Sequence, residues 1–229
     1  MQQENQTNPN IQTIKIWDLP TRLFHWSLVI LLGVSWASIE LSDNAFNIHE
    51  YSGYTILSLV IFRVLWGIFG STTSRFRTFI RGLQPTIAYA KTLLQSKPGN
   101  QIGHNPLGGW MVLLMLGFLL FQAVTGLFSN DDVSSEGPLA HWISKDISDI
   151  LSGLHHESFD ILLVIVGLHI AAVLFYRFFK RDNLITPLIT GFKPLAGETP
   201  PKLRFTSNWI ALLLFGIVIA GVALLVTKA

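Results

Sequence analysis

Cysteine is absent from this sequence of 229 residues. Its absence excludes disulfides, cysteine-ligated iron–sulfur clusters, zinc–thiolate sites and the Cys-x-x-Cys-His attachment of c-type haem. Any metal or cofactor must then be held by His, Asp, Glu, Met or the main chain. The seven histidines are therefore the residues that most need an explanation.

Charge is also scarce, because only 13% of the residues are Asp, Glu, Lys or Arg, whereas soluble domains carry about 25%. Half of the residues are hydrophobic, and the mean hydropathy is +0.46. This composition predicts an integral membrane protein. Basic cytoplasmic loops explain the net charge of +2 and the pI near 9.0, so we expect a lipid bilayer, and no nucleic acid, as partner.

Five apolar runs approach the roughly 20 residues that a helix needs to cross a bilayer. They lie near residues 23–39, 53–69, 109–128, 158–179 and 209–226. The first ten residues are polar and lack the order of features typical of a signal peptide, so we expect the first span to be retained as an anchor. The predicted fold is all-α and integral to the membrane: a four-helix transmembrane bundle plus a fifth, C-terminal transmembrane helix.

The segments between the runs alternate in charge. Residues 40–52 carry only acids and 70–108 only bases, while 129–157 are mainly acidic and 180–208 mainly basic. The positive-inside rule then predicts a multi-pass protein of the bacterial cytoplasmic (inner) membrane with a cytoplasmic N-terminus. The direction of the fifth span, and hence a periplasmic C-terminus, follows only by counting.

Helical periodicity predicts which histidines share a face. His155 and His169 are 14 residues apart, which is about 1400° of helical rotation, or roughly 40° short of four turns. Their rings therefore lie on one face, separated by a rise of about 21 Å. His156 is 13 residues from His169 and falls on nearly the opposite face.

Antiparallel register then predicts two histidine pairs. His25, at the inner end of the first span, lies at the depth of His169, and His49, at the outer end of the second, lies at the depth of His155. Two imidazoles at one depth suit the axial ligation of b-type haem, which needs no covalent attachment. We therefore expect two non-covalent haems b, an inner one on His25 and His169 and an outer one on His49 and His155.

Arg63 is 14 residues after His49, so it shares that face and reaches the inner depth. We expect it to neutralise a propionate of the inner haem, with snorkelling or a main-chain carbonyl as alternative partners. Glycines inside the spans either let a macrocycle approach a helix or allow close helix packing; they are Gly33, Gly117, Gly126 and Gly167.

The remaining polar residues have simpler interpretations. His104 and His141 lie in loops and are interpreted as surface or structural residues. Glu157 and Asp160, near the outer end of the fourth span, are explained by solvation and by the charge of a helix N-terminus, with proton handling as the alternative.

Four motifs resemble the bacterial cytochrome b561 family, in the branch that includes the b-type cytochrome subunits of nickel–iron hydrogenases. The motifs are Trp17–Trp26 (WDLPTRLFHW), His49–Gly67, Gly103–Trp110 (GHNPLGGW) and His155–Leu174. The resemblance covers about residues 14–194. It implies a di-haem four-helix electron carrier and the same two ligand pairs. Two features depart from the family pattern: the first two ligands are only 24 residues apart, and a fifth apolar span follows.

The chain is accordingly divided into a polar tail (1–13), a di-haem cytochrome b domain (14–194) and a linker with an additional C-terminal helix (195–229). The predicted function is electron transfer across the membrane between quinone or quinol and an outer redox partner. That partner is a periplasmic c-type cytochrome or a hydrogenase-like enzyme. The basic segment 70–108 is a candidate region for quinone, and no residue of the chain is assigned a catalytic role.

Two other functions stay open at this point. One is a membrane oxidoreductase that acts directly on a small periplasmic substrate with quinone. The other is a cofactor-free transporter or assembly factor, although no inverted repeat is visible in the sequence.

Overall fold

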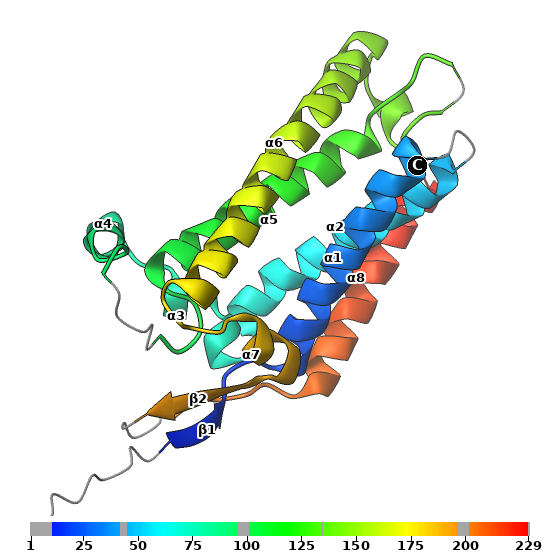
Figure 1. Cartoon of the computed structure of the whole chain (residues 1–229). Helices are drawn as coiled ribbons and strands as arrows, with labels where there is room; N and C mark the ends of the chain where they lie inside the picture. Colours follow the sequence, from blue (N-terminus) through cyan, green and yellow to red (C-terminus); the bar gives the residue numbers. More distant parts are fainter. Residues whose placement is uncertain (1–10, 42–44, 96–100, 134, 197–201, 229) are drawn as a thin grey trace, which may run out of the picture.

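Five long helices dominate the computed structural model, which describes residues 11–41, 45–95, 101–133, 135–196 and 202–228 (Figure 1). Each of the five is long and apolar enough to cross a membrane. They are α1 (Leu19–Glu40), α2 (Phe46–Phe69), α5 (Pro106–Leu127), α6 (Lys145–Phe178) and α8 (Asn208–Lys228). The expected all-α membrane fold is confirmed. Helix α6 begins well before its apolar run, and the search for apolar runs missed its first turns because they are polar.

Two of the sequence motifs are helix starts. Asp18 caps α1, and its Oδ1 accepts a hydrogen bond of 2.8 Å from the main-chain N–H of Thr21. Asn105 caps α5 in the same way, through a bond of 2.7 Å from the N–H of Gly108. In both helices a proline stands in the first turn, where its missing N–H costs no hydrogen bond. These motifs thus begin the two helices by the same local chemistry.

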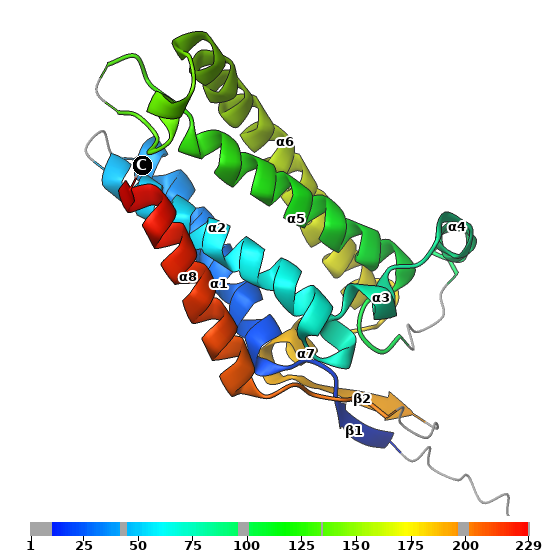
Figure 2. The same cartoon turned by 180° about the vertical axis from the view of Figure 1, so that it is seen from behind.

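Helix α2 is the centre of the bundle. In its most apolar stretch 56% of the residues are buried, against 17% in each of the other four helices. It packs against α1, α5 and α8, while α6 packs mainly on α5 (Figures 1 and 2). Val60 and Trp66 of α2 are fully enclosed. The outer faces of the other helices carry exposed apolar side chains, as expected for helices in contact with lipid.

A small antiparallel sheet closes one end of the bundle, which we call the sheet end. It pairs β1 (Ile11–Lys15) with β2 (Phe192–Ala196). The same end carries four short helices: η1 (Thr72–Ser74), α3 (Phe76–Phe79), α4 (Leu83–Lys91) and α7 (Ile185–Thr190) (Figure 1). The sequence did not predict the sheet. Its two strands cross the predicted boundaries of the haem domain, β1 at the tail and β2 at the linker. Residues 1–10 of that tail lie outside the described residues.

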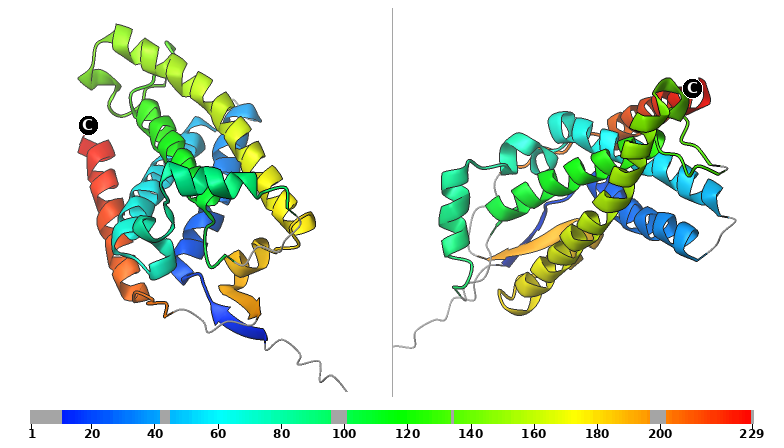
Figure 3. Two further views of the ribbon diagram at one scale, coloured as in Figure 1. Left: turned by 90° about the vertical axis from the view of Figure 1, so that its left-hand side faces the viewer. Right: turned by 90° about the horizontal axis from the view of Figure 1, so that it is seen from above.

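The far end carries the loop between α5 and α6, with η2 (Ala140–Trp142) inside it. Ser148 and Ser152 of α6 bind this loop through hydrogen bonds to Phe128 and Asn130. Helix α8 lies at one edge of the bundle in Figure 3. It buries Ala211, Val218 and Val222.

Candidate functional site

Two pairs of histidine rings face each other between helices, one pair near each end of the bundle. The ring centres of His25 in α1 and His169 in α6 are 6.4 Å apart, with their planes tilted by 50°. Those of His49 in α2 and His155 in α6 are 6.0 Å apart, with planes at 87°. The structure therefore brings together the residues that helical register predicted to share a depth. His156 is exposed.

The spacing of both pairs suits one metal ion between two imidazoles. A metal–imidazole bond of about 2 Å on each side places the centres of two axial rings roughly 6 Å apart. Among the described residues, no three His, Cys, Asp or Glu side chains are grouped so that they could hold a metal ion. Each pair can thus supply two ligands only. This donor set fits haem iron, whose other four ligands come from the macrocycle.

The rings of His49 and His155, which form the pair at the far end and are called the far pair, are oriented by contacts of their Nδ1 atoms. His155 Nδ1 lies 2.9 Å from the main-chain oxygen of Gln122, and His49 Nδ1 lies 3.1 Å from that of Ser35. A histidine whose Nδ1–H donates to a carbonyl presents the lone pair of Nε2, which is the usual arrangement for a metal ligand. The local contacts therefore favour coordination by Nε2 at this pair.

Gly126 lets α5 approach the ring of His155. A Cβ atom at this position would lie 2.9 Å from Cε1 and 3.2 Å from Nδ1 of His155. The three other glycines singled out from the sequence have nothing within 4 Å of such a Cβ, so close helix packing does not explain them; they are Gly33, Gly117 and Gly167.

Arg63 is a buried cation at the sheet end, with only 2% of its surface exposed. Its guanidinium lies over the ring of Phe76, 5.3 Å from the ring centre, and its Nη1 has no hydrogen-bond partner. His25 Nδ1, near the same end, is also buried without a partner. The sheet-end pair therefore lacks the main-chain contacts that orient the far pair.

Asp18 is the buried acid of this region, and it is already saturated with donors. Beyond its bond from Thr21, its Oδ2 accepts from Trp66 Nε1 at 2.9 Å and from Ser74 Oγ at 3.0 Å. Burial alone would raise the pKa of Asp18, but hydrogen bonds from Ser71, Thr21 and Trp66 hold it below its usual value. Asp18 therefore remains ionised and joins the start of α1 to the end of α2.

His104 was interpreted as a surface or structural residue, and it is a half-buried side chain with packing contacts. Its ring lies between Trp17 and Phe79, with ring centres 4.8 and 4.5 Å away, and its Nδ1 is buried without a partner. Burial, together with the nearby Arg63 cation and the rings of His169 and His25, lowers the pKa of His104 to about 3. The loop that carries it folds back under the bundle instead of standing in solvent.

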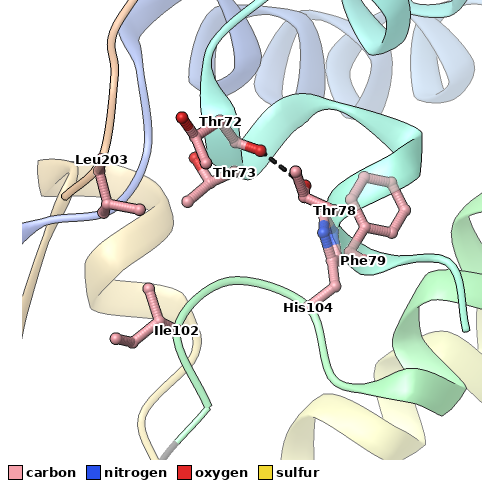
Figure 4. Close-up of a pocket in the computed structure, with 7 residues that line it drawn as sticks. All are labelled: Thr72, Thr73, Thr78, Phe79, Ile102, His104 and Leu203. Atoms are coloured by element: carbon pink, nitrogen blue, oxygen red, sulfur yellow. Dashed lines mark hydrogen bonds between the residues drawn. The ribbon is translucent and has the colours of Figure 1, made fainter. Parts of the chain in front are cut away.

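A small cavity of about 190 Å³ adjoins His104 (Figure 4). It is lined by Thr72, Thr73, Thr78, Phe79, Ile102, His104 and Leu203.

Other residues singled out from the sequence do not line this cavity: His141, Glu157 and Asp160 are exposed. In the basic segment 70–108, Arg75 donates to the main-chain oxygen of Gly70 at 2.6 Å and Arg77 is exposed, so these cations do not converge on one ligand.

Comparisons with known proteins identify the family to which the chain is similar. The family described as prokaryotic cytochrome b561 matches residues 16–191. The chain is 28% identical over 217 residues to a "Probable Ni/Fe-hydrogenase B-type cytochrome subunit" of Rhizobium leguminosarum bv. viciae, covering 79% of this chain and 88% of the relative. It is 26% identical over 218 residues to a protein of the same name from Bradyrhizobium diazoefficiens, covering 78% and 85%. No solved structure matches the chain.

Proposed function

The chain belongs to the prokaryotic cytochrome b561 family, and from this premise we propose that it carries electrons across the cytoplasmic membrane between the quinone pool and a periplasmic redox partner. Membership of the family makes it a multi-pass membrane b-type cytochrome that contains haem b. The proposal adds the number of haems, their ligands, and the two partners.

The two histidine pairs are the observation that carries the proposal. His25 and His169 would hold one haem b, and His49 and His155 would hold the second. Haem b, when bound, supplies reversible one-electron chemistry. The four histidines would supply the nitrogens that hold the iron, and the Nδ1 contacts of His49 and His155 fix the orientation of their rings.

The position of the pairs supports transfer across the bilayer. His155 and His169 are 14 residues apart on α6, a rise of about 21 Å, against a hydrocarbon core of about 30 Å. One redox site near each end of the bundle is what a transmembrane electron carrier requires. The many basic residues of the sheet end support a cytoplasmic position for it.

A hydrogenase-like enzyme is the partner that the names of the relatives support. Helix α6 has 34 residues, about 51 Å of helix, so its first turns extend beyond a bilayer of ordinary thickness. This extension leads directly to His155 and carries the exposed side chains of Ile147, Ile150 and Leu154. We therefore place the partner's docking surface there, on the far end of the bundle.

Counting haem in the purified protein tests the proposal. Two non-covalent haems b per chain are expected from a pyridine haemochrome assay, and acid–acetone should extract both because the chain has no cysteine to bind them. A ratio near one would show that one pair is not a ligand pair. A protein without a Soret band would contradict the proposal and favour a cofactor-free function.

Two further measurements test the partners. Ile150→Glu should slow haem reduction by the partner enzyme while leaving the haem content at two. Quinone reduction by a small periplasmic reductant, with purified protein and no accessory enzyme, would instead favour the direct oxidoreductase.

A further inference from the structure

Among the described residues, four buried side-chain nitrogen or oxygen atoms lack a partner. One is Nε of Arg22, whose Nη2 donates to the main-chain oxygen of Ile189, and the other three lie in one region of the sheet end. They are His25 Nδ1, Arg63 Nη1 and His104 Nδ1. Arg63 lies over the ring of Phe76, whose centre is 5.8 Å from that of Phe79, and Phe79 in turn contacts His104. The charges of Arg63 and His25 also act on His104, so the three side chains lie in one region. Buried polar groups are almost always hydrogen-bonded in native proteins. Their shared lack of a partner indicates a missing acceptor.

The described part of the chain does not supply that acceptor. No carboxylate there is within ion-pair distance of Arg63. Asp18 is the acid whose charge Arg63 senses, but its two oxygens are already used by Thr21, Trp66 and Ser74. Phe76 offers the guanidinium only the face of its ring. A buried cation is stable only when an anion or several acceptors compensate it.

The size of the cavity beside His104 limits what can bind there to a small group. The cavity beside His104 has a volume of about 190 Å³, below the roughly 300–1,000 Å³ of sites that enclose whole small molecules. Its threonine hydroxyls already donate to main-chain oxygens: Thr73 to Ile16, Thr78 to Thr72, and Thr72 to Arg204. The cavity therefore has room for a carboxylate arm or for water.

We propose that His104 and Arg63 together receive the propionates of the haem held by His25 and His169, with His104 donating a hydrogen bond through Nδ1. This inference rests on the proposed function, because it requires a haem at that pair. Each haem b brings two carboxylates, which are the anions that the locality lacks. Arg63 contributes the charge, and His104 contributes a directional N–H.

The ring of His104 is suited to this role. Trp17 and Phe79 enclose it from two sides, so its orientation is fixed before haem binds. Its low pKa keeps the free ring neutral, and a neutral imidazole still carries one N–H donor. A propionate beside the ring stabilises that N–H, because a donor to a charged acceptor makes a stronger hydrogen bond than a donor to a neutral one.

Three substitutions of His104 separate hydrogen bonding from packing. His104→Leu removes the donor. His104→Asn keeps an N–H near the position of Nδ1, whereas His104→Gln places it near Nε2. His141→Leu, at an exposed loop histidine, is the matched control. For each variant, the haem-to-chain ratio and both midpoint potentials are measured by redox titration of the purified protein.

We expect His104→Leu and His104→Gln to lower the midpoint potential of one haem only. Without the donor, the propionate charge is less compensated and favours the oxidised, more positive iron. His104→Asn should restore the wild-type potential, and His141→Leu should change neither haem. Unchanged potentials in His104→Leu, or equal shifts or haem loss in the Leu and Asn variants, would overturn the inference.

The proposed function can fail separately from this inference. If the wild-type protein binds no haem, or if His25→Ala leaves both haems bound, the ligand assignment itself is wrong. If the wild type binds two haems and His25→Ala removes one, but His104→Leu leaves both potentials unchanged, only the role of His104 is wrong.

Discussion

His49 and His155 each use one ring nitrogen to hold the ring in position. Because Nδ1 contacts a main-chain oxygen in both cases, neither ring has to be ordered by the metal itself. Contacts of this kind fix the tautomer and raise the basicity of the other nitrogen. His25 has no such contact in the described structure, so we expect its orientation to depend more on the bound haem.

The adjacent histidines of α6 are predicted to differ completely in their effect on haem. His155→Ala should reduce the proposed haem content from two towards one, because it removes the proposed ligand whose ring centre lies 6.0 Å from that of His49. His156→Ala should leave both haems bound, because that side chain is exposed. Haem-to-chain ratios of the two purified variants check this. The reverse pattern would show that the assigned register of α6 is wrong.

Arg63→Leu should lower the midpoint potential of one haem and leave the other nearly unmoved. A buried cation beside a propionate stabilises the reduced iron more than the oxidised iron, so its removal favours oxidation. For a one-electron couple, about 60 mV corresponds to about 1.4 kcal/mol, and we expect a shift of tens of millivolts on this scale.

Arg63→Lys is the conservative variant for that titration. It should retain much of the potential, although an ammonium cannot reproduce a bidentate contact with a carboxylate. If the midpoint potentials of both haems are unchanged in Arg63→Leu, Arg63 is only a packing residue over Phe76.

At the scale of elements, the contact between α5 and α6 is built around the ring of His155. The main-chain oxygen of Gln122 and the hydroxyl of Thr125 contact the ring from α5, and Ser158 donates to the side-chain oxygen of Gln122. Gly126 completes this surface by leaving out a side chain. The two helices are therefore held at the separation that the histidine requires.

Gly126→Ala should weaken haem binding at the His49–His155 pair. The added methyl group would lie 2.9 Å from Cε1 of His155, so the ring must move and its bond to Gln122 must lengthen. Disturbing the partner of a metal-ligating histidine typically weakens metal binding roughly 10- to 100-fold. Haem titration of the apo-protein measures this.

Gly216→Ala in α8 is the control for that substitution. Nothing lies within 4 Å of a Cβ atom at Gly216, so the same chemical change should leave haem affinity unaltered. Normal affinity in Gly126→Ala would mean that α5 and α6 can separate at little cost.

On the scale of the whole molecule, the sheet end and the far end have different chemistry. The sheet end is basic, carries the β1–β2 sheet, and holds Asp18 and Arg63 in its interior, with His104 half-buried beside them. The far end is acidic and carries the extension of α6. This polarity supports the proposed direction of the protein in the membrane.

Single cysteines can test the direction without background, because the native chain has none. Val133→Cys, at a position 89% exposed at the far end, should react in intact spheroplasts with a thiol reagent that does not cross membranes. Arg77→Cys, exposed at the sheet end, should react only after the membrane is permeabilised. The opposite labelling pattern would reverse the topology.

Local regularities of the sequence determined most of the helical architecture and the histidine pairs. A spanning helix must satisfy its own backbone within one segment, so length and apolarity suffice to find α1, α2, α5, α6 and α8. Residues on one face of a helix recur every 3.6 positions. The spacing along α6 therefore placed His155, and not His156, on the face that carries His169. Charge alternation along the chain predicted two chemically different ends.

Tertiary structure alone decided what surrounds the sheet-end pair. The β1–β2 pairing joins strands from opposite ends of the chain, and five residues are too few for a period to identify such strands. His104 lies in a loop, where no helical phase indicates its neighbours, and its burial depends on Trp17 and Phe79 from two other segments. Periodicity tells which residues share a face of one helix, but only packing determines what that face meets.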